Sequence, residues 1–147
     1  MKKKIFYIYF TDNEGKKIIK HLNDEFGWEP EVICGDDGIN TIKWFKNNKL
    51  SPLLINTLFL RQAKFEYLPK TKKHCINLKL FKFASKYFSQ FLGILHDTDG
   101  WNFSYEERKS FFYEVLSYWN EIILNRKPDF IMFRTSPHLA SCFSLYI

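Results

Sequence analysis

The stretch Pro128-Asp129-Phe130-Ile131-Met132-Phe133-Arg134-Thr135-Ser136-Pro137-His138 predicts a strand, a sharp turn and the opening of a helix. A short apolar run between a proline and polar residues is typical of a strand buried on both faces of a parallel sheet. A hydroxyl residue then stands at the N-cap and a proline at the first helical position, where its missing N–H costs nothing. Open α/β sheets bind ligands, and anionic ligands especially, at such junctions. We therefore expect Arg134, Ser136 and Pro137 to bind a ligand.

A purely structural interpretation of this junction stays open. Every strand that leads into a helix has free N–H groups at the helix start, and most of these bind only water. A single histidine near a helix start, such as His138, is more often a cap or a packed ring than a catalyst.

Length and composition limit the class of protein. A chain of 147 residues with 19% aromatic side chains is long enough for one domain with a real core. The apolar run after Lys2-Lys3-Lys4 is too short for a secretory signal, and no run approaches transmembrane length. The three cysteines, Cys34, Cys75 and Cys142, are widely spaced and form no metal-ligand pattern. They indicate reduced thiols in a cytoplasmic protein.

The formal net charge of +6 raises the question of nucleic-acid binding. The lysines are spread along the chain, with clusters at 64–73 and 79–86, and no nucleic-acid motif accompanies them, so we expect no nucleic-acid partner. A solvated face, a contact with anionic lipid at the inner membrane, or the handling of anionic substrates fits this charge better.

The first 38 residues predict a β-α-β unit. A strand over 4–10 is followed by polar residues that can cap a helix, then by a helix over 15–26 that ends at Gly27, and by a second strand over 31–35. Because Asp12 lies in the turn between the first strand and the following helix, we include it among the ligand-binding residues. The turn lacks the glycines of a dinucleotide-binding loop, so an NAD or FAD site is not expected, and there is no P-loop.

Residues 39–93 are the least informative part of the chain. A short helix is predicted around Trp44 and Phe45, while the apolar runs 53–55 and 58–60 are too short to assign. Aromatic and lysine residues over 79–92 suit one basic helix, which either covers the sheet as a solvated helix or contacts a membrane surface.

The pair Asp97 and Asp99 follows the apolar run 91–95. Two carboxylates with this spacing after a strand can hold a divalent metal ion that bridges to a nucleotide-sugar diphosphate, with His96 as a further ligand. The alternative is a plain turn, since Asp-Thr-Asp-Gly consists of turn-forming residues.

The sequence predicts a long helix over 105–126. Ser104 and Glu107 form a capping box, and cations followed by Pro128 end the helix. Its apolar side chains recur at helical spacing, so we expect it to lie on a sheet beside the strand at Phe130. These are Phe112, Val115, Leu116, Trp119, Ile122 and Ile123.

The C-terminal part of the sequence resembles the N-terminal part of bacterial capsular-polysaccharide biosynthesis proteins. The resemblance is carried by the aromatic helix, the Lys127-Pro128-Asp129 strand, the Ser136-Pro137-His138 turn and the later pair Leu145-Tyr146. The capsule proteins are glycosyltransferase-like proteins with a Pro-Asp strand, a Pro-His turn and a helix that carries a Leu-Tyr pair. The resemblance is strongest over 103–147 and is compatible with the β-α-β opening.

The resemblance implies an α/β fold, in which a Rossmann-like parallel sheet flanked by helices forms an incomplete N-terminal half of a B-type glycosyltransferase. It implies a glycan acceptor bound by this half, a nucleotide-sugar donor held mainly by a second half, and a catalytic or hydrogen-bonding role for His138 at the cleft. The apolar end at Leu145-Tyr146-Ile147 predicts a chain truncated at the C-terminus, inactive alone.

Two other classes of function stay open. One is a metal-dependent nucleotide-sugar transferase of the A type, which would use Asp97 and Asp99. The other is a non-catalytic α/β module that binds a partner, a function that abundant aromatic side chains and the lack of a convincing catalytic set would suit.

Overall fold

The structure of the protein is a computed structural model of residues 1–147, and it describes residues 2–35, 38–56, 78–99 and 104–134. The chain divides into two compact units. The first consists of Met1–Leu58 with Arg126–Ser136, and the second of Phe59–Asn125 with Pro137–Ile147. The first unit holds the sheet, and the described elements of the second are helices.

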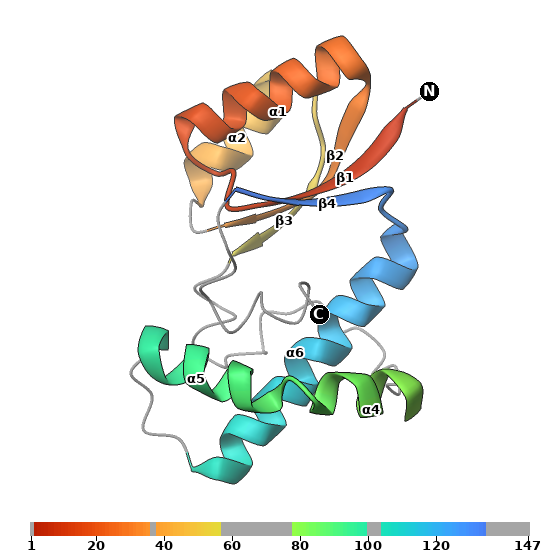
Figure 1. The fold of residues 1–147 in the computed structure, drawn as a ribbon. Coiled ribbons are helices and arrows are strands. Elements are labelled where there is room, and N and C mark those ends of the chain that lie inside the picture. The colour runs from red at the N-terminus through yellow and green to blue at the C-terminus, as the bar shows by residue number, and fades with distance from the viewer. Residues whose placement is uncertain (1, 36–37, 57–77, 100–103, 135–147) are drawn as a thin grey trace. The chain divides into compact units, whose positions relative to one another are not determined.

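The first unit is a parallel sheet with helices on one face, as Figure 1 shows. Its strands lie in the order β3-β2-β1-β4, and every adjacent pair is parallel. This confirms the predicted Rossmann-like α/β fold and its β-α-β opening, and it makes a strand of the unassigned run at 53–55. The elements are β1 (Lys3–Ile8), α1 (Asn13–Phe26), β2 (Trp28–Gly35), α2 (Ile39–Asn47), β3 (Leu53–Asn56) and β4 (Phe130–Phe133).

Helix α1 begins and ends at the residues that the sequence indicates. The Asp12 carboxylate accepts a hydrogen bond of 2.7 Å from the Gly15 N–H, which makes Asp12 the N-cap. Gly27 takes a left-handed conformation with φ 66°, and its N–H donates to the carbonyl of Asn23 at 3.0 Å. Both helix boundaries are therefore set by local chemistry.

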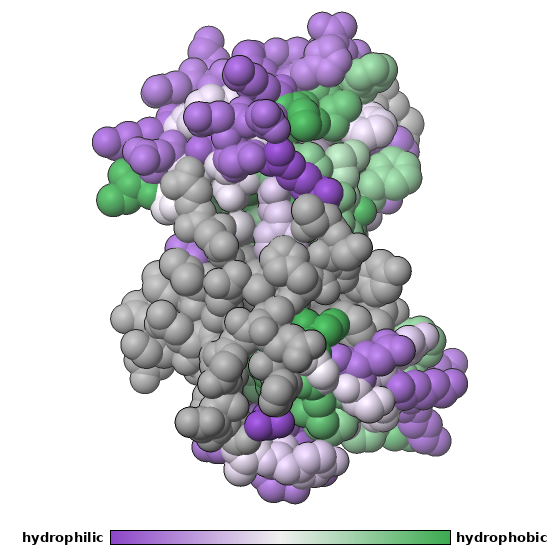
Figure 2. Space-filling model, turned by 60° about the vertical axis from the view of Figure 1, so that its left-hand side comes forward, coloured by the Kyte–Doolittle hydropathy of each residue, from purple (hydrophilic) through white to green (hydrophobic). Residues whose placement is uncertain are grey.

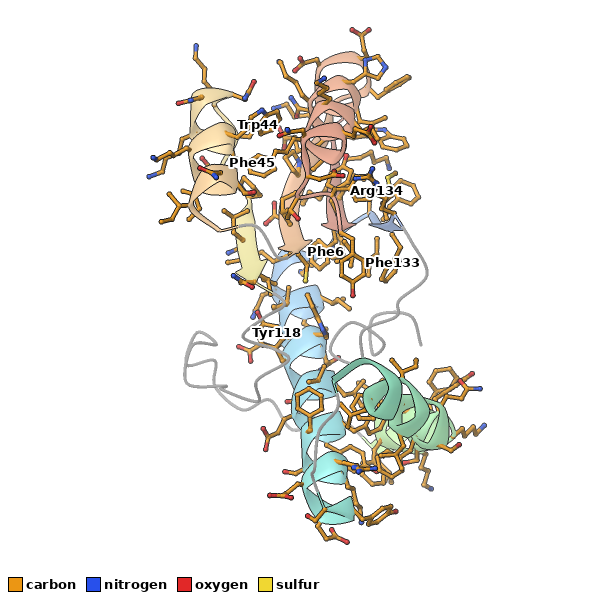
Figure 3. All side chains as sticks on the ribbon, turned by 90° about the vertical axis from the view of Figure 1, so that its left-hand side faces the viewer. Phe6, Trp44, Phe45, Tyr118, Phe133 and Arg134 are labelled. Carbon is orange, nitrogen blue, oxygen red and sulfur yellow. The ribbon has the colours of Figure 1, made fainter. Side chains whose placement is uncertain are left out.

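The core of the first unit follows the alternation of side chains along the strands. On the helix-covered face, six buried residues form one cluster, to which α2 contributes Phe45 beside the partly buried Trp44 (Figure 3). On the opposite face, Phe6, Ile8, Val32 and Cys34 are fully buried. Cys34 carries a thiol and is not part of a disulfide. The six clustered residues are Ile5, Tyr7, Phe10, Ile19, Ile33 and Phe45.

Strand β4 corrects one expectation. It was predicted to be buried on both faces, but it pairs only with β1 at the edge of the described sheet, and Phe130 is 52% exposed. Asp129 fixes its register, because its carboxylate accepts from the Lys4 N–H at 2.8 Å while its own N–H donates to the Lys4 carbonyl at 2.8 Å.

The described part of the second unit consists of three helices: α4 (Leu78–Ser85), α5 (Phe88–Asp99) and α6 (Tyr105–Arg126). The single basic helix predicted over 79–92 is therefore wrong, since a turn at Lys86 and Tyr87 divides it. In the described region, no helix is long and apolar enough to cross a membrane.

Helix α6 packs by its aromatic residues against helices. The ring of Phe112 lies 4.9 Å from that of Phe91 and 5.3 Å from that of Phe88, and Tyr113 stacks on Phe81 at 4.9 Å. Phe112, on the predicted apolar face, has its ring partners on α5, and the neighbouring Tyr113 has its ring partner on α4. Helical periodicity shows which face is buried but not what covers it.

The capping box of α6 is confirmed. The Ser104 N–H donates to the Glu107 carboxylate at 2.7 Å, and the Glu107 N–H donates to the Ser104 hydroxyl at 3.3 Å. The helix ends at Arg126, and Lys127 leaves it with φ 47° before Pro128.

Candidate functional site

The strand order creates a topological switch point beside β1. The chain moves from β1 to β2 and β3 on one side and then places β4 on the other side. In open parallel sheets of this kind, ligands bind outside the carboxyl ends of the two strands where the order reverses. For this sheet, that place lies between the ends of β1 and β4, at Ile8 and Phe133.

Three charged side chains meet at this point. Arg134, directly after β4, forms an ion pair with Asp12 and a second with Glu14, whose carboxylate lies 2.9 Å from the guanidinium. Figure 3 shows Arg134 at the end of β4, beside α1. We name Asp12, Glu14 and Arg134 the switch-point triad. Since its side chains are 55%, 80% and 29% exposed, it is open to a ligand from solvent.

Asp12 and Arg134 stabilise each other in their ionised forms. The hydrogen bond from Arg134 is the main reason why the pKa of Asp12 lies below its ordinary value, and the bond from the Gly15 N–H lowers it further. The hydrogen bond to Asp12 raises the pKa of Arg134. Asp12 is therefore a carboxylate acceptor of low basicity, which suits binding better than proton abstraction. Such exposed ion pairs contribute little to folding because water screens them, so a ligand can replace one at small cost.

The backbone around the triad is tightly built. A Cβ atom at Gly15 would lie 2.6 Å from the carbonyl oxygen of Phe10, so the start of α1 approaches the turn after β1 as closely as only glycine allows. Tyr9 turns the chain out of β1 with φ 67°, a conformation that non-glycine residues seldom adopt and that often marks functional sites. The N–H of Tyr9 donates to the Cys34 carbonyl at 2.8 Å and ties this turn to β2.

The triad combines acceptors and donors in a way that selects a ligand type. Carboxylates only accept hydrogen bonds and a guanidinium only donates them, whereas a hydroxyl does both. Vicinal hydroxyls of a sugar can therefore donate to Asp12 or Glu14 and accept from Arg134. A phosphate would be attracted by Arg134 but repelled by two carboxylates. The site consequently favours a hydroxyl-rich ligand over a diphosphate.

The sequence identified two residues that the fold brings together. Asp12 and Arg134, predicted separately as ligand-binding residues, form an ion pair across more than a hundred residues of chain. Ser136, Pro137 and His138 lie outside the described residues, so their predicted roles stay predictions.

Glu14 and Lys16 were not among the predicted site residues. Glu14 appeared only as part of a helix-capping segment. Lys16 is 4% exposed in the first turn of α1, and its charge also lowers the pKa of Asp12. Lys16 lies three residues before the buried Ile19 on the same helix face, and this spacing could have indicated that Lys16 is buried.

The predicted metal pair is in a different element from the one expected. Asp97 and Asp99 belong to the last turn of α5 and do not follow a strand. The apolar run before them is helical because Phe88, Phe91 and Leu95 recur at helical spacing, the latter two being fully buried. The side chains of residues 96–99 lie outside the described part of the structure, so the metal site at Asp97 and Asp99 stays a prediction. Among the side chains that the structure does describe, no three from His, Cys, Asp or Glu gather as a metal site would require.

A cavity of about 420 Å³ lies at the opposite, amino edge of the sheet. Its carboxylates are already engaged: Glu29 with Lys2, and Glu31 with Arg126 at 3.1 Å and Lys4 at 3.9 Å. Ligands of open α/β sheets bind at the carboxyl edge, so this cavity is the weaker candidate. Its lining is Lys2, Asn23, Gly27, Glu29, Pro30, Glu31, Lys49, Leu50 and Ser51.

Comparisons with protein-family models, with curated proteins and with solved structures found no match. The candidate site therefore depends on the geometry of this chain alone.

Proposed function

We propose that the chain is the acceptor-side, Rossmann-like part of a glycosyltransferase-like protein of capsular or surface polysaccharide biosynthesis. The observation that carries the proposal is the switch-point triad, in which two carboxylates and a guanidinium stand open to solvent at the place where such sheets bind ligands. The resemblance of the Pro-Asp strand and the Pro-His turn to capsule biosynthesis proteins supports the same conclusion.

In this proposal the triad binds hydroxyl groups of a glycan acceptor. Arg134 and Asp12 separate slightly, and each exchanges its partner for a sugar hydroxyl, so no charge is left without a hydrogen bond. A nucleotide-sugar is the donor that the resemblance implies, and His138 is the proposed base or hydrogen-bond donor at the acceptor. The proposed setting is cytoplasmic.

The test is binding of the purified chain to an array of bacterial oligosaccharides and polysaccharides. We expect selective binding of one group of glycans that Arg134→Gln weakens about tenfold or more, since a hydrogen bond to a charged group contributes about 1.5–3 kcal/mol.

Arg126→Gln is the matched control. It also removes an arginine that is paired with a carboxylate in the first unit, but at the amino edge of the sheet, where Arg126 contacts Glu31. Glycan binding should survive this change. Absence of glycan binding by the unmodified chain, or an equal loss in both variants, would contradict the proposed function.

A further inference from the structure

Helix α4 presents an exposed surface that the proposed function does not use. Leu78 is 66% exposed and Phe83 43%, while Phe81 is 41% exposed beside its stacking contact with Tyr113. Around them stand the exposed side chains of Lys79, Lys82 and Lys86. We name these six residues the α4 surface. Figure 2 shows that hydrophilic and hydrophobic residues lie side by side on the surface of the helical unit, in the lower part of the view.

The lysines of the α4 surface lie together. Lys79, Lys82 and Lys86 are spaced by three and four residues, so they lie along one side of the helix and of the turn that follows it. Leu78 and Phe83 flank this row, while the buried Ala84 marks the side that faces inward. Phe81 stacks on Tyr113 of α6, which holds α4 in place by an aromatic contact.

The charge of this surface has one sign. The sequence contains no acidic residue between Glu66 and Asp97. Within the part of the chain that the structure describes, no ion pair engages the ammonium groups of Lys79, Lys82 or Lys86. The row of lysines is thus available to an external anion.

We infer that the α4 surface binds the anionic surface of a lipid bilayer. Lysines beside exposed Leu and Phe on one helix are the composition of helices that lie in the membrane interface, where apolar side chains enter the acyl boundary and ammonium groups contact anionic headgroups. A nucleic acid would match the lysines but not the apolar flanks. This inference is independent of the proposed glycan function, because α4 and the triad belong to different units.

The experiment is flotation of the purified chain with vesicles. We expect the chain to float with vesicles of equal parts phosphatidylcholine and phosphatidylglycerol, and to stay behind with phosphatidylcholine alone. Replacing Lys79, Lys82 and Lys86 by Gln should lower the partition coefficient on the order of a hundredfold at low salt, because each lysine near an anionic surface contributes about a fivefold factor. Raising the ionic strength should weaken binding of the unmodified chain.

The matched control replaces Lys17, Lys43 and Lys46 by Gln. These lysines are also exposed, but they lie on α1 and α2, and the change in net charge is the same. The control should retain nearly all of its binding. A third variant, Leu78→Gln with Phe83→Gln, keeps every charge and should weaken binding through the lost apolar contact.

The outcomes separate the alternatives. Loss confined to the α4 variants, with unchanged circular dichroism, supports the inference. No binding to anionic vesicles, equal loss in the lysine control, or binding unaffected by the apolar variant would each overturn it.

Discussion

Alanine at Gly15 should destabilise the first unit, although alanine is the better helix former. A Cβ atom there would lie 2.6 Å from the carbonyl oxygen and 2.7 Å from both the carbonyl carbon and the Cα of Phe10. Since all three contacts are backbone atoms, no side chain can rotate away. The start of α1 must therefore shift away from the backbone of Phe10 in the turn after β1.

Whether Gly15→Ala raises or lowers the free energy of unfolding depends on the sizes of the opposing effects. Replacing glycine by alanine inside a helix contributes at most about 1 kcal/mol of stability. Overpacking costs about 1–3 kcal/mol. Displacing α1 also weakens the hydrogen bond of 2.7 Å from Gly15 to the Asp12 cap, a loss of about 1 kcal/mol. We expect a net destabilisation of about 2 kcal/mol, or a shift of about 1 M in the urea midpoint for a chain of this size.

Gly93→Ala is the matched control. Gly93 lies inside α5, and a Cβ atom there meets nothing within 4 Å. This variant should gain about 0.5–1 kcal/mol from helix propensity alone. Urea unfolding followed by circular dichroism and tryptophan fluorescence measures both. A Gly15→Ala chain as stable as the unmodified protein would refute the close approach of α1 to the turn at Phe10.

Three further predictions concern single side chains. Asp12→Ala should cost about 1 kcal/mol in urea unfolding because α1 loses its N-cap. Asp12→Asn should stay near the unmodified stability because asparagine caps as well, so a similar loss in both would show that the charge and not the cap stabilises α1. Burial raises the pKa of Tyr7 from 10.0 to about 12, so the folded state retains a proton that the unfolded chain releases. The free energy of unfolding should therefore fall as the pH rises from 10 to 12, and Tyr7→Phe should lack that part of the decline. Ser104→Ala should cost about 1 kcal/mol by opening the capping box of α6, and an unchanged thermal unfolding curve would contradict it.

Local chemistry made the helix boundaries predictable. Asp12, Gly27 and Ser104 act on groups within a few residues of themselves, so their roles follow from sequence spacing alone. The first strands were predictable for a related reason, because β-branched and aromatic residues are enriched in strands and polar residues bound these runs.

Packing partners were not predictable in the same way. The apolar face of α6 is visible in the sequence, but a stripe of Phe and Val fits a sheet or a helix equally well. Here the rings of Phe88 and Phe91 contact Phe112 on that face. The division into α4 and α5 depends on a turn at Lys86 and Tyr87, and no glycine or proline in the sequence indicates this turn.

The candidate site could also be predicted only in part from the sequence. Asp12 and Arg134 each had a local reason to be selected, as residues at the ends of strands. Their ion pair depends on the parallel pairing of β1 with β4, which is a property of strand order. Strand order is decided by long-range packing, so the switch-point triad becomes visible only in the folded chain.

The central claim is that the switch-point triad binds a glycan. Its most direct test is to titrate the isotope-labelled chain with the oligosaccharide that binds best on the array and to follow the backbone amide resonances. We predict the largest shifts over 11–16 and at Arg134. Shifts concentrated at 29–31 and 49–51, around the amino-edge cavity, or no shifts at all, would contradict the claim.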